Sequence, residues 1–245
     1  MSTKSFFTKS LITLTIISAS YTAFANTSLT IYTSQPNEDI QQTVSAFNEV
    51  HPDIEVKWVR DGTTKLMARY QAEQAAGAKS PDLLLIADSM TMESLVQQDM
   101  LHAYQSPNAD SFSKELYSAD GYYYGTKLIT TGIGYNTQAP EQPQSWSDLT
   151  KDNYKNLTVM PSPLYSGAAV IHMATLTDHP DLGWDYYEQL NTNGVAAQGG
   201  NGGVLTAIAS GSKAYGVIVD YMVMREKPKV LQSSSYSQLK GQYGN

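Results

Sequence analysis

The feature that most constrains the fold of this chain is a regular alternation of strand-like and helix-like segments that begins near residue 28. Leu29–Tyr32 is a short apolar strand, and Ile54–Val59 alternates as a strand does. Apolar residues at helical spacing follow each of them. Leu83–Ala87 is a continuous apolar run, typical of a strand covered on both faces. This strand–helix order predicts a parallel sheet with right-handed crossovers.

A second α/β unit is predicted to follow. A strand is expected near residues 128–135, an apolar helix over Gly167–Leu176 and a buried strand at Tyr215–Val219. We therefore expect an α/β protein with two lobes, each a mostly parallel sheet with flanking helices, and a cleft between them. The predicted division is lobe one at 26–128, lobe two at 129–220 with crossing strands at both ends, and a return segment and tail at 221–245.

Residues 1–25 have the three parts of a secretory signal peptide. Lys4 and Lys9 form a basic start, and Leu11–Ile17 is an apolar run too short to span a bilayer. Ala23–Ala25 then provides the small residues that signal peptidase requires. We expect cleavage after this segment and a soluble periplasmic protein, with an N-terminal membrane anchor as the alternative.

The composition excludes several classes of function. The formal net charge is −7 and there is no cysteine. A chain with this negative charge lacks the excess of basic residues that is typical of proteins that bind nucleic acid. The lack of cysteine excludes thiolate zinc sites, iron–sulfur clusters and a lipid anchor on an N-terminal cysteine. The four histidines have no metal-binding spacing, and no nucleophile elbow or phosphate loop occurs. We expect neither a cofactor nor an enzyme; a secreted lyase or phosphatase is the alternative.

Small and polar residues follow the predicted strands at the positions where open α/β sheets bind ligands. Helix N-termini direct their N–H groups to that edge, which favours anions. Ser166 and Asn201 have the chemistry of helix N-caps, and their small neighbours let a ligand approach the backbone. We expect a ligand site formed by twelve residues: Ser34, Gln35, Thr63, Asp88, Ser89, Ser166, Gly167, Ala168, Asn201, Gly202, Asp220 and Tyr221.

Much of the chain resembles the periplasmic ferric-ion-binding proteins of ABC importers, which are type 2 periplasmic binding proteins. The resemblance covers nearly all of residues 28–227 and is carried by six segments: Ser28–Phe47, Asp61–Ala72, Asp88-Ser89, Pro163–Ala168, Asn201–Gly211 and Gly216–Tyr221. It implies a monomeric binding protein that delivers a small ligand to a permease and ATPase of the inner membrane. A sensor that docks on a membrane kinase is the alternative. Family members bind iron, thiamine, phosphonates and sugar phosphates.

The same resemblance allows two possible ligands, ferric ion and an organic anion, to be compared. The positions that match the family's ferric ligands are Pro36, Asp88, Tyr221 and Met222. The proline and the thioether of Met222 are not suitable ligands for ferric ion, so only Asp88 and Tyr221 remain of the four. The positions that match the family's phosphate site are Ser166, Gly167, Ala168 and Asn201. We therefore expect an organic anion of the phosphate or phosphonate type and no metal, with ferric iron held by Asp88 and Tyr221 as the alternative.

The end of the chain departs from the resemblance. Relatives continue well past the return strand, with elements that complete lobe one, and commonly read Ala-Lys-Gly-Ser-Pro-Val after the lysine that matches Lys227. Here Pro228–Gln232 follows, and its codons read one base earlier can encode Ala-Lys-Gly-Ser-Pro. We expect a frameshift near Lys227 and a chain that lacks the C-terminal part of lobe one. A naturally short protein is the alternative, and the nucleotide sequence distinguishes the two.

Overall fold

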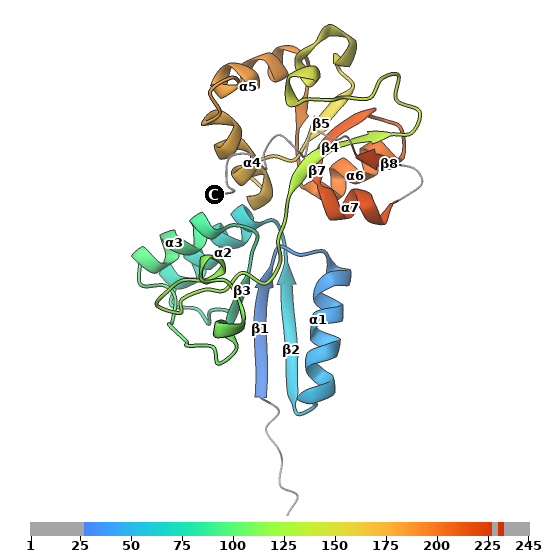
Figure 1. Cartoon of the computed structure of the whole chain (residues 1–245). Coiled ribbons are helices and arrows are strands. Elements are labelled where there is room, and N and C mark those ends of the chain that lie inside the picture. The colour runs from blue at the N-terminus through green and yellow to red at the C-terminus, as the bar shows by residue number, and fades with distance from the viewer. Residues whose placement is uncertain (1–26, 227–229, 233–245) are drawn as a thin grey trace, which may run out of the picture.

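The computed structural model describes residues 27–226 and 230–232, and its strands form two sheets, one in each of two lobes (Figure 1). The signal peptide predicted for residues 1–25 lies outside the described residues, as does most of the predicted tail, including the expected frameshift position. No helix of the described part is long and apolar enough to cross a membrane.

Lobe one is built on a parallel three-stranded sheet, as the alternation of strands and helices predicts. Its elements are β1 (Thr27–Thr33), α1 (Asn37–Val50), β2 (Ile54–Arg60), α2 (Thr63–Ala75), β3 (Leu83–Leu85), α3 (Ser89–Gln97), η1 (Ala109–Ser111) and η2 (Lys114–Leu116). The strand order is β2-β1-β3, and all pairings are parallel. Figure 1 shows α1 on one side of the sheet and α2 and α3 on the other. Leu66 and Leu95 from these last two helices are buried in one core with Tyr32 of β1.

The third strand is less covered than its sequence predicts. Leu83 is 53% exposed, and Leu84 and Leu85 are half-buried. The expectation of a strand covered on both faces is therefore wrong for β3. The physical reason is its place at the edge, because β3 pairs only with β1 among the described strands.

Lobe two is built on a five-stranded sheet in the order β6-β5-β7-β4-β8. Its elements are β4 (Thr131–Asn136), η3 (Trp146–Thr150), η4 (Asp152–Tyr154), β5 (Thr158–Met160), α4 (Gly167–Thr177), α5 (Gly183–Thr192), β6 (Ala196–Ala197), α6 (Asn201–Ala209), β7 (Tyr215–Val219), α7 (Asp220–Arg225) and β8 (Val230–Gln232). The two-lobed α/β class is confirmed. This second sheet is mixed, because β4 runs antiparallel to β7 and β8 while β5 pairs in parallel. The strand β8 was not expected from the sequence.

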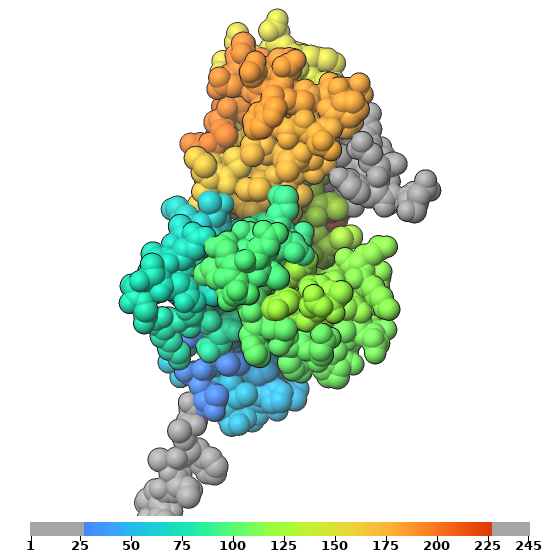
Figure 2. Space-filling view, turned by 90° about the vertical axis from the view of Figure 1, so that its left-hand side faces the viewer, coloured from blue at the N-terminus to red at the C-terminus, as the bar shows by residue number. Residues whose placement is uncertain are grey.

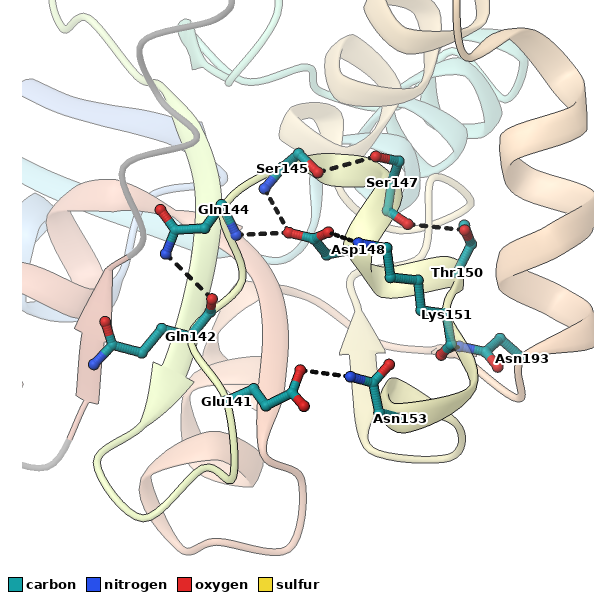
Figure 3. Close-up of polar contacts among 10 residues, drawn as sticks. All are labelled: Glu141, Gln142, Gln144, Ser145, Ser147, Asp148, Thr150, Lys151, Asn153 and Asn193. Atoms are coloured by element: carbon teal, nitrogen blue, oxygen red, sulfur yellow. Dashed lines mark hydrogen bonds and ion pairs between the residues drawn. The ribbon is translucent and has the colours of Figure 1, made fainter.

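A buried carboxylate organises the loop that leads into η3 (Figure 3). Oδ2 of Asp148 accepts the backbone N–H groups of Gln144 at 2.7 Å and Ser145 at 2.9 Å, which closes a capping box. Its Oδ1 accepts from Nζ of Lys151 at 2.6 Å. Burial alone would raise the pKa of Asp148, but these hydrogen bonds outweigh it and lower the pKa. The loop is thereby fixed while Trp146 inserts into the core of lobe two.

Candidate functional site

A cavity of about 650 Å³ lies between the two lobes, a volume typical of small-molecule sites. Figure 2 shows the side of the molecule on which lobe one, in blue to green, meets lobe two, in yellow to orange. Eleven of the twelve residues expected from the sequence line this cavity. The twelfth residue, Asp220, is not among those that line the cavity. Its carboxylate accepts hydrogen bonds from the hydroxyl of Thr130 and the backbone N–H of Tyr221.

Helix starts from both lobes converge on the cavity because each follows the end of a strand or a tight turn. Thr63 opens α2 directly after β2, and Asp88 caps α3 after β3. From lobe two, Ser166 caps α4 and Asn201 opens α6. Backbone N–H groups at helix starts lack partners within their helix. The N–H groups of Thr64, Thr91 and Ala169 are hydrogen-bonded to Tyr165, Asp88 and Ser166, so the other first-turn N–H groups are the donors available to a ligand.

The start of α4 is held by a small network of side chains. Oγ of Ser166 accepts the N–H of Ala169 at 3.4 Å, which confirms the predicted N-cap. The N-cap interpretation is wrong for Asn201, because Gly200 occupies the cap position of α6. Asn201 instead donates from Nδ2 to Ser166 Oγ at 3.3 Å and accepts the N–H of Val219 at 3.0 Å. Its side chain therefore ties α4 and α6 to the end of β7.

Asp88 of lobe one lies in close contact with the start of α4 at the edge of the cavity. It is 5% exposed, and its Oδ1 accepts the N–H of Thr91 at 2.6 Å. A Cβ placed on Gly167 would lie 2.7 Å from Oδ2 of Asp88 and 2.8 Å from Oγ1 of Thr63. The lack of a side chain at Gly167 therefore allows this close approach. A ligand bound at the start of α4 would therefore lie beside a carboxylate.

Two cations that the sequence analysis did not single out also line the cavity, Arg60 and Lys127. Arg60 donates from Nε to the backbone O of Gln35 at 3.1 Å and from an Nη to the hydroxyl of Tyr165 at 3.4 Å. Among the described residues it forms no salt bridge. Arg60 is the last residue of a strand, where a charged side chain is ordinary, so no local pattern marks it. The site thus has a positive charge that helix starts alone do not supply.

Lys127 belongs to an ion cluster that joins the lobes behind Tyr221. Its Nζ lies 2.7 Å from Oδ2 of Asp39, whose Oδ1 accepts from Arg225 at 2.6 Å. Both cations also flank the Tyr221 ring, with Nζ of Lys127 3.8 Å and Cζ of Arg225 4.9 Å from its centroid. Burial first, and then the negative charge of Asp39, raise the pKa of Tyr221. The neutral phenol is therefore favoured over the phenolate that would bind ferric ion.

The part of the chain that the structure describes holds no group of three or more His, Asp or Glu side chains placed to bind a metal. Asp88 and Tyr221, the two surviving ferric positions, both line the cavity. The other two matching positions, Pro36 and Met222, line it as well. The structure thus places all four family positions at the same site, with two of them chemically unsuited to iron.

Comparison with known proteins decides the family. The family described as bacterial extracellular solute-binding protein matches residues 78–229, more than half of the chain. The chain belongs to this family. A protein of Sinorhizobium fredii, y4fP, which is named as an ABC transporter periplasmic-binding protein, is 25% identical over 196 residues. That alignment covers 74% of this chain and 52% of the relative, so this solute-binding protein spans about half the length of the curated relative it matches.

Solved structures show the same fold. The periplasmic binding protein P5PA has a TM-score of 0.73 and 22% identity, over 84% of this chain and 69% of its own. AfuA of Actinobacillus pleuropneumoniae, with exogenous fructose-6-phosphate bound, has a TM-score of 0.71 and 21% identity, over 85% and 69%. Iron-bound HitA of Pseudomonas aeruginosa has a TM-score of 0.69 and 19% identity, over 84% and 69%. These similarities establish the two-lobed architecture of this solute-binding protein.

Proposed function

We propose that this protein is the substrate-binding component of an ABC importer and captures a small organic anion of the phosphate or phosphonate type between its lobes. It would act as a periplasmic monomer that delivers the ligand to a permease and ATPase in the inner membrane. The observation that carries the proposal is the meeting of the α4 start with the Arg60 guanidinium in one cavity. Backbone N–H groups and a guanidinium are the donors that phosphate groups favour.

The carboxylate of Asp88 beside the α4 start narrows the class of anion. Asp88 is buried, and only its Oδ1 has a hydrogen-bond donor among the described residues. A bare anion beside this carboxylate would be repelled, whereas a hydroxyl group would donate a hydrogen bond to it. The site therefore favours a phosphate or phosphonate joined to a hydroxyl-bearing carbon skeleton. The fructose-6-phosphate bound to the structurally similar AfuA belongs to this chemical class.

Ferric iron is the second candidate, because Asp88 and Tyr221 line the same cavity and iron-bound HitA shares the fold. Two features weaken it. Burial raises the pKa of Tyr221 and so disfavours the phenolate, and the positive charges of Lys127 and Arg225 beside the ring would repel a ferric cation. A role as a sensor for a membrane kinase would be indicated by a kinase gene, rather than permease and ATPase genes, next to the coding sequence.

Calorimetry of the purified chain with fructose-6-phosphate, inorganic phosphate and ferric citrate tests the proposal. We expect the sugar phosphate to bind more tightly than inorganic phosphate. The Ser166→Ala/Asn201→Ala variant should lose roughly two orders of magnitude in affinity or more, since charge-assisted hydrogen bonds contribute roughly 1.5–3 kcal/mol each. Ser45→Ala/Asn191→Ala changes the same residue types at exposed positions outside the cavity and should bind as the parent does.

Two outcomes would contradict the proposal. Equal affinity of the parent and the Ser166→Ala/Asn201→Ala variant would show that the anion does not bind at the start of α4. Binding of ferric iron with a visible absorption band from Tyr221, without any binding of sugar phosphate, would favour the iron alternative instead.

A further inference from the structure

We propose that Tyr165 is the latch that holds the two lobes closed over the cavity. Its ring occupies a slot between Gly62 of lobe one and Gly200 of lobe two, and its backbone carbonyl caps α2 of the opposite lobe. We call this set of contacts the Tyr165 latch. The latch would control how the lobes close over the cavity in which the ligand is proposed to bind. It rests on the proposed function only in that closure is taken to enclose that ligand.

The two glycines are explained by their contact with Tyr165 and not by their own backbone conformation. Gly62 has φ −67° and ψ 149°, and Gly200 has φ −120° and ψ −177°, conformations that any residue adopts. A Cβ on Gly62 would lie 2.2 Å from the carbonyl O of Tyr165 and 2.6 Å from its ring. A Cβ on Gly200 would lie 2.8 Å from the ring. Glycine at both positions is therefore what allows Tyr165 to fit between the lobes.

The backbone of the latch satisfies a helix start from the opposite lobe. No side chain caps α2 at its N-cap residue, Gly62. The N–H of Thr64 in the first turn donates instead to the carbonyl O of Tyr165 at 3.3 Å. The hydroxyl of Thr64 also donates to the carbonyl O of Pro163 at 3.1 Å. Because unpaired N–H groups at helix starts need a partner, closure exchanges water for protein carbonyls at this point.

The polar edge of the ring connects the latch to the ligand cavity. The Tyr165 hydroxyl accepts from Arg60 at 3.4 Å, and Nζ of Lys65 lies 5.3 Å from the ring centroid. Tyr165 also hydrogen-bonds with Asp61, the residue before Gly62, and burial together with this bond raises the pKa of the phenol. Arg60 is the cation proposed to face the anion. A ligand that holds this guanidinium in place would therefore also hold in place the hydrogen-bond donor of the Tyr165 hydroxyl.

The test measures closure directly, in phosphate-free buffer with no ligand added. The chain has no cysteine, so spin labels at Met90→Cys on α3 and Glu188→Cys on α5 report the distance between lobes. Gly62→Ala should shift the distance distribution to longer values. Gly203→Ala is the control, because a Cβ at that position has no neighbour within 4 Å, and it should leave the distribution unchanged.

Amide hydrogen exchange separates loss of the latch from damage to lobe one. In Gly62→Ala the Thr64 amide should exchange at least about tenfold faster, because overpacking opposes the closed state. The Leu66 amide donates to the carbonyl O of Gly62 within lobe one at 2.9 Å, so its exchange should stay as in the parent. An unchanged distance distribution and unchanged Thr64 exchange in Gly62→Ala would refute the latch. Neither result depends on anion binding, so the latch and the anion site fail or stand separately.

Discussion

Asp39→Asn tests whether the ion cluster behind Tyr221 holds three distant segments together. Asp39 lies in the first turn of α1, its side chain is 8% exposed, and it pairs with Lys127 at 2.7 Å and Arg225 at 2.6 Å. The partners stand 88 and 186 residues further along the chain. Asparagine preserves the shape of the side chain and removes its charge, so the variant isolates the electrostatic contribution.

The expected loss lies between those of buried and exposed ion pairs. Breaking a fully buried pair costs roughly 3–5 kcal/mol, and an exposed pair contributes roughly 0.2–1 kcal/mol. Here the carboxylate is buried, while the side chains of Lys127 and Arg225 are 30% and 52% exposed and regain hydration. We therefore expect Asp39→Asn to lower the free energy of unfolding by about 1.5–3 kcal/mol at pH 7.

The loss should also depend on pH in a defined direction. Burial would raise the pKa of Asp39, but hydrogen bonds from Arg225 and Lys127 outweigh it and hold the pKa below its ordinary value of 3.8. A carboxyl group with a lowered pKa in the folded state contributes its full stabilisation above the unfolded value, and this is lost as the pH falls through the folded value. The difference between parent and variant should therefore be constant above about pH 5 and shrink toward acid.

Urea unfolding followed by circular dichroism measures this difference. Glu55→Gln is the matched control, because Glu55 pairs with Lys57 at 3.0 Å with side chains 52% and 61% exposed. The control should cost less than about 0.5 kcal/mol. The reasoning would be refuted if Asp39→Asn cost no more than Glu55→Gln at pH 7, or if its cost increased on acidification.

Two further predictions concern the core of lobe two. Burial lowers the pKa of His172 to about 4 from an ordinary 6.5, so the unfolded chain takes up a proton that the folded chain does not. Stability should fall as the pH drops from 6.5 toward 4, by up to about 3 kcal/mol, and urea midpoints of His172→Gln should lose most of this dependence. The hydroxyl of Tyr186 is buried without a hydrogen-bond partner among the described residues. Tyr186→Phe should therefore leave the melting temperature unchanged or raise it, and a clear decrease would show that the hydroxyl is bonded.

Much of the architecture could be predicted from the sequence, because its signals are local. The alternation of strands and helices determined a parallel sheet in lobe one, and the buried strand Tyr215–Val219 lies where its apolar run predicts. Eleven of the twelve expected site residues, among them Ser34 and Ser166, line one cavity. This follows from the topology, since ligands of open α/β sheets bind beyond the strand ends. The ligand contacts themselves stay a prediction, as do the exact boundaries of the two lobes.

Only the tertiary structure decided which residues meet across the cavity. Arg60 ends an ordinary strand and Tyr165 precedes an ordinary N-cap, and nothing in either local sequence shows that they are hydrogen-bonded to each other. Leu83 reads as a covered strand but lies at an edge, and Asn201 reads as a cap but braces Ser166. In each case the outcome depends on a partner from a distant part of the chain. Local sequence determines the period and the ends of an element, whereas contacts between lobes are determined by how the assembled elements pack.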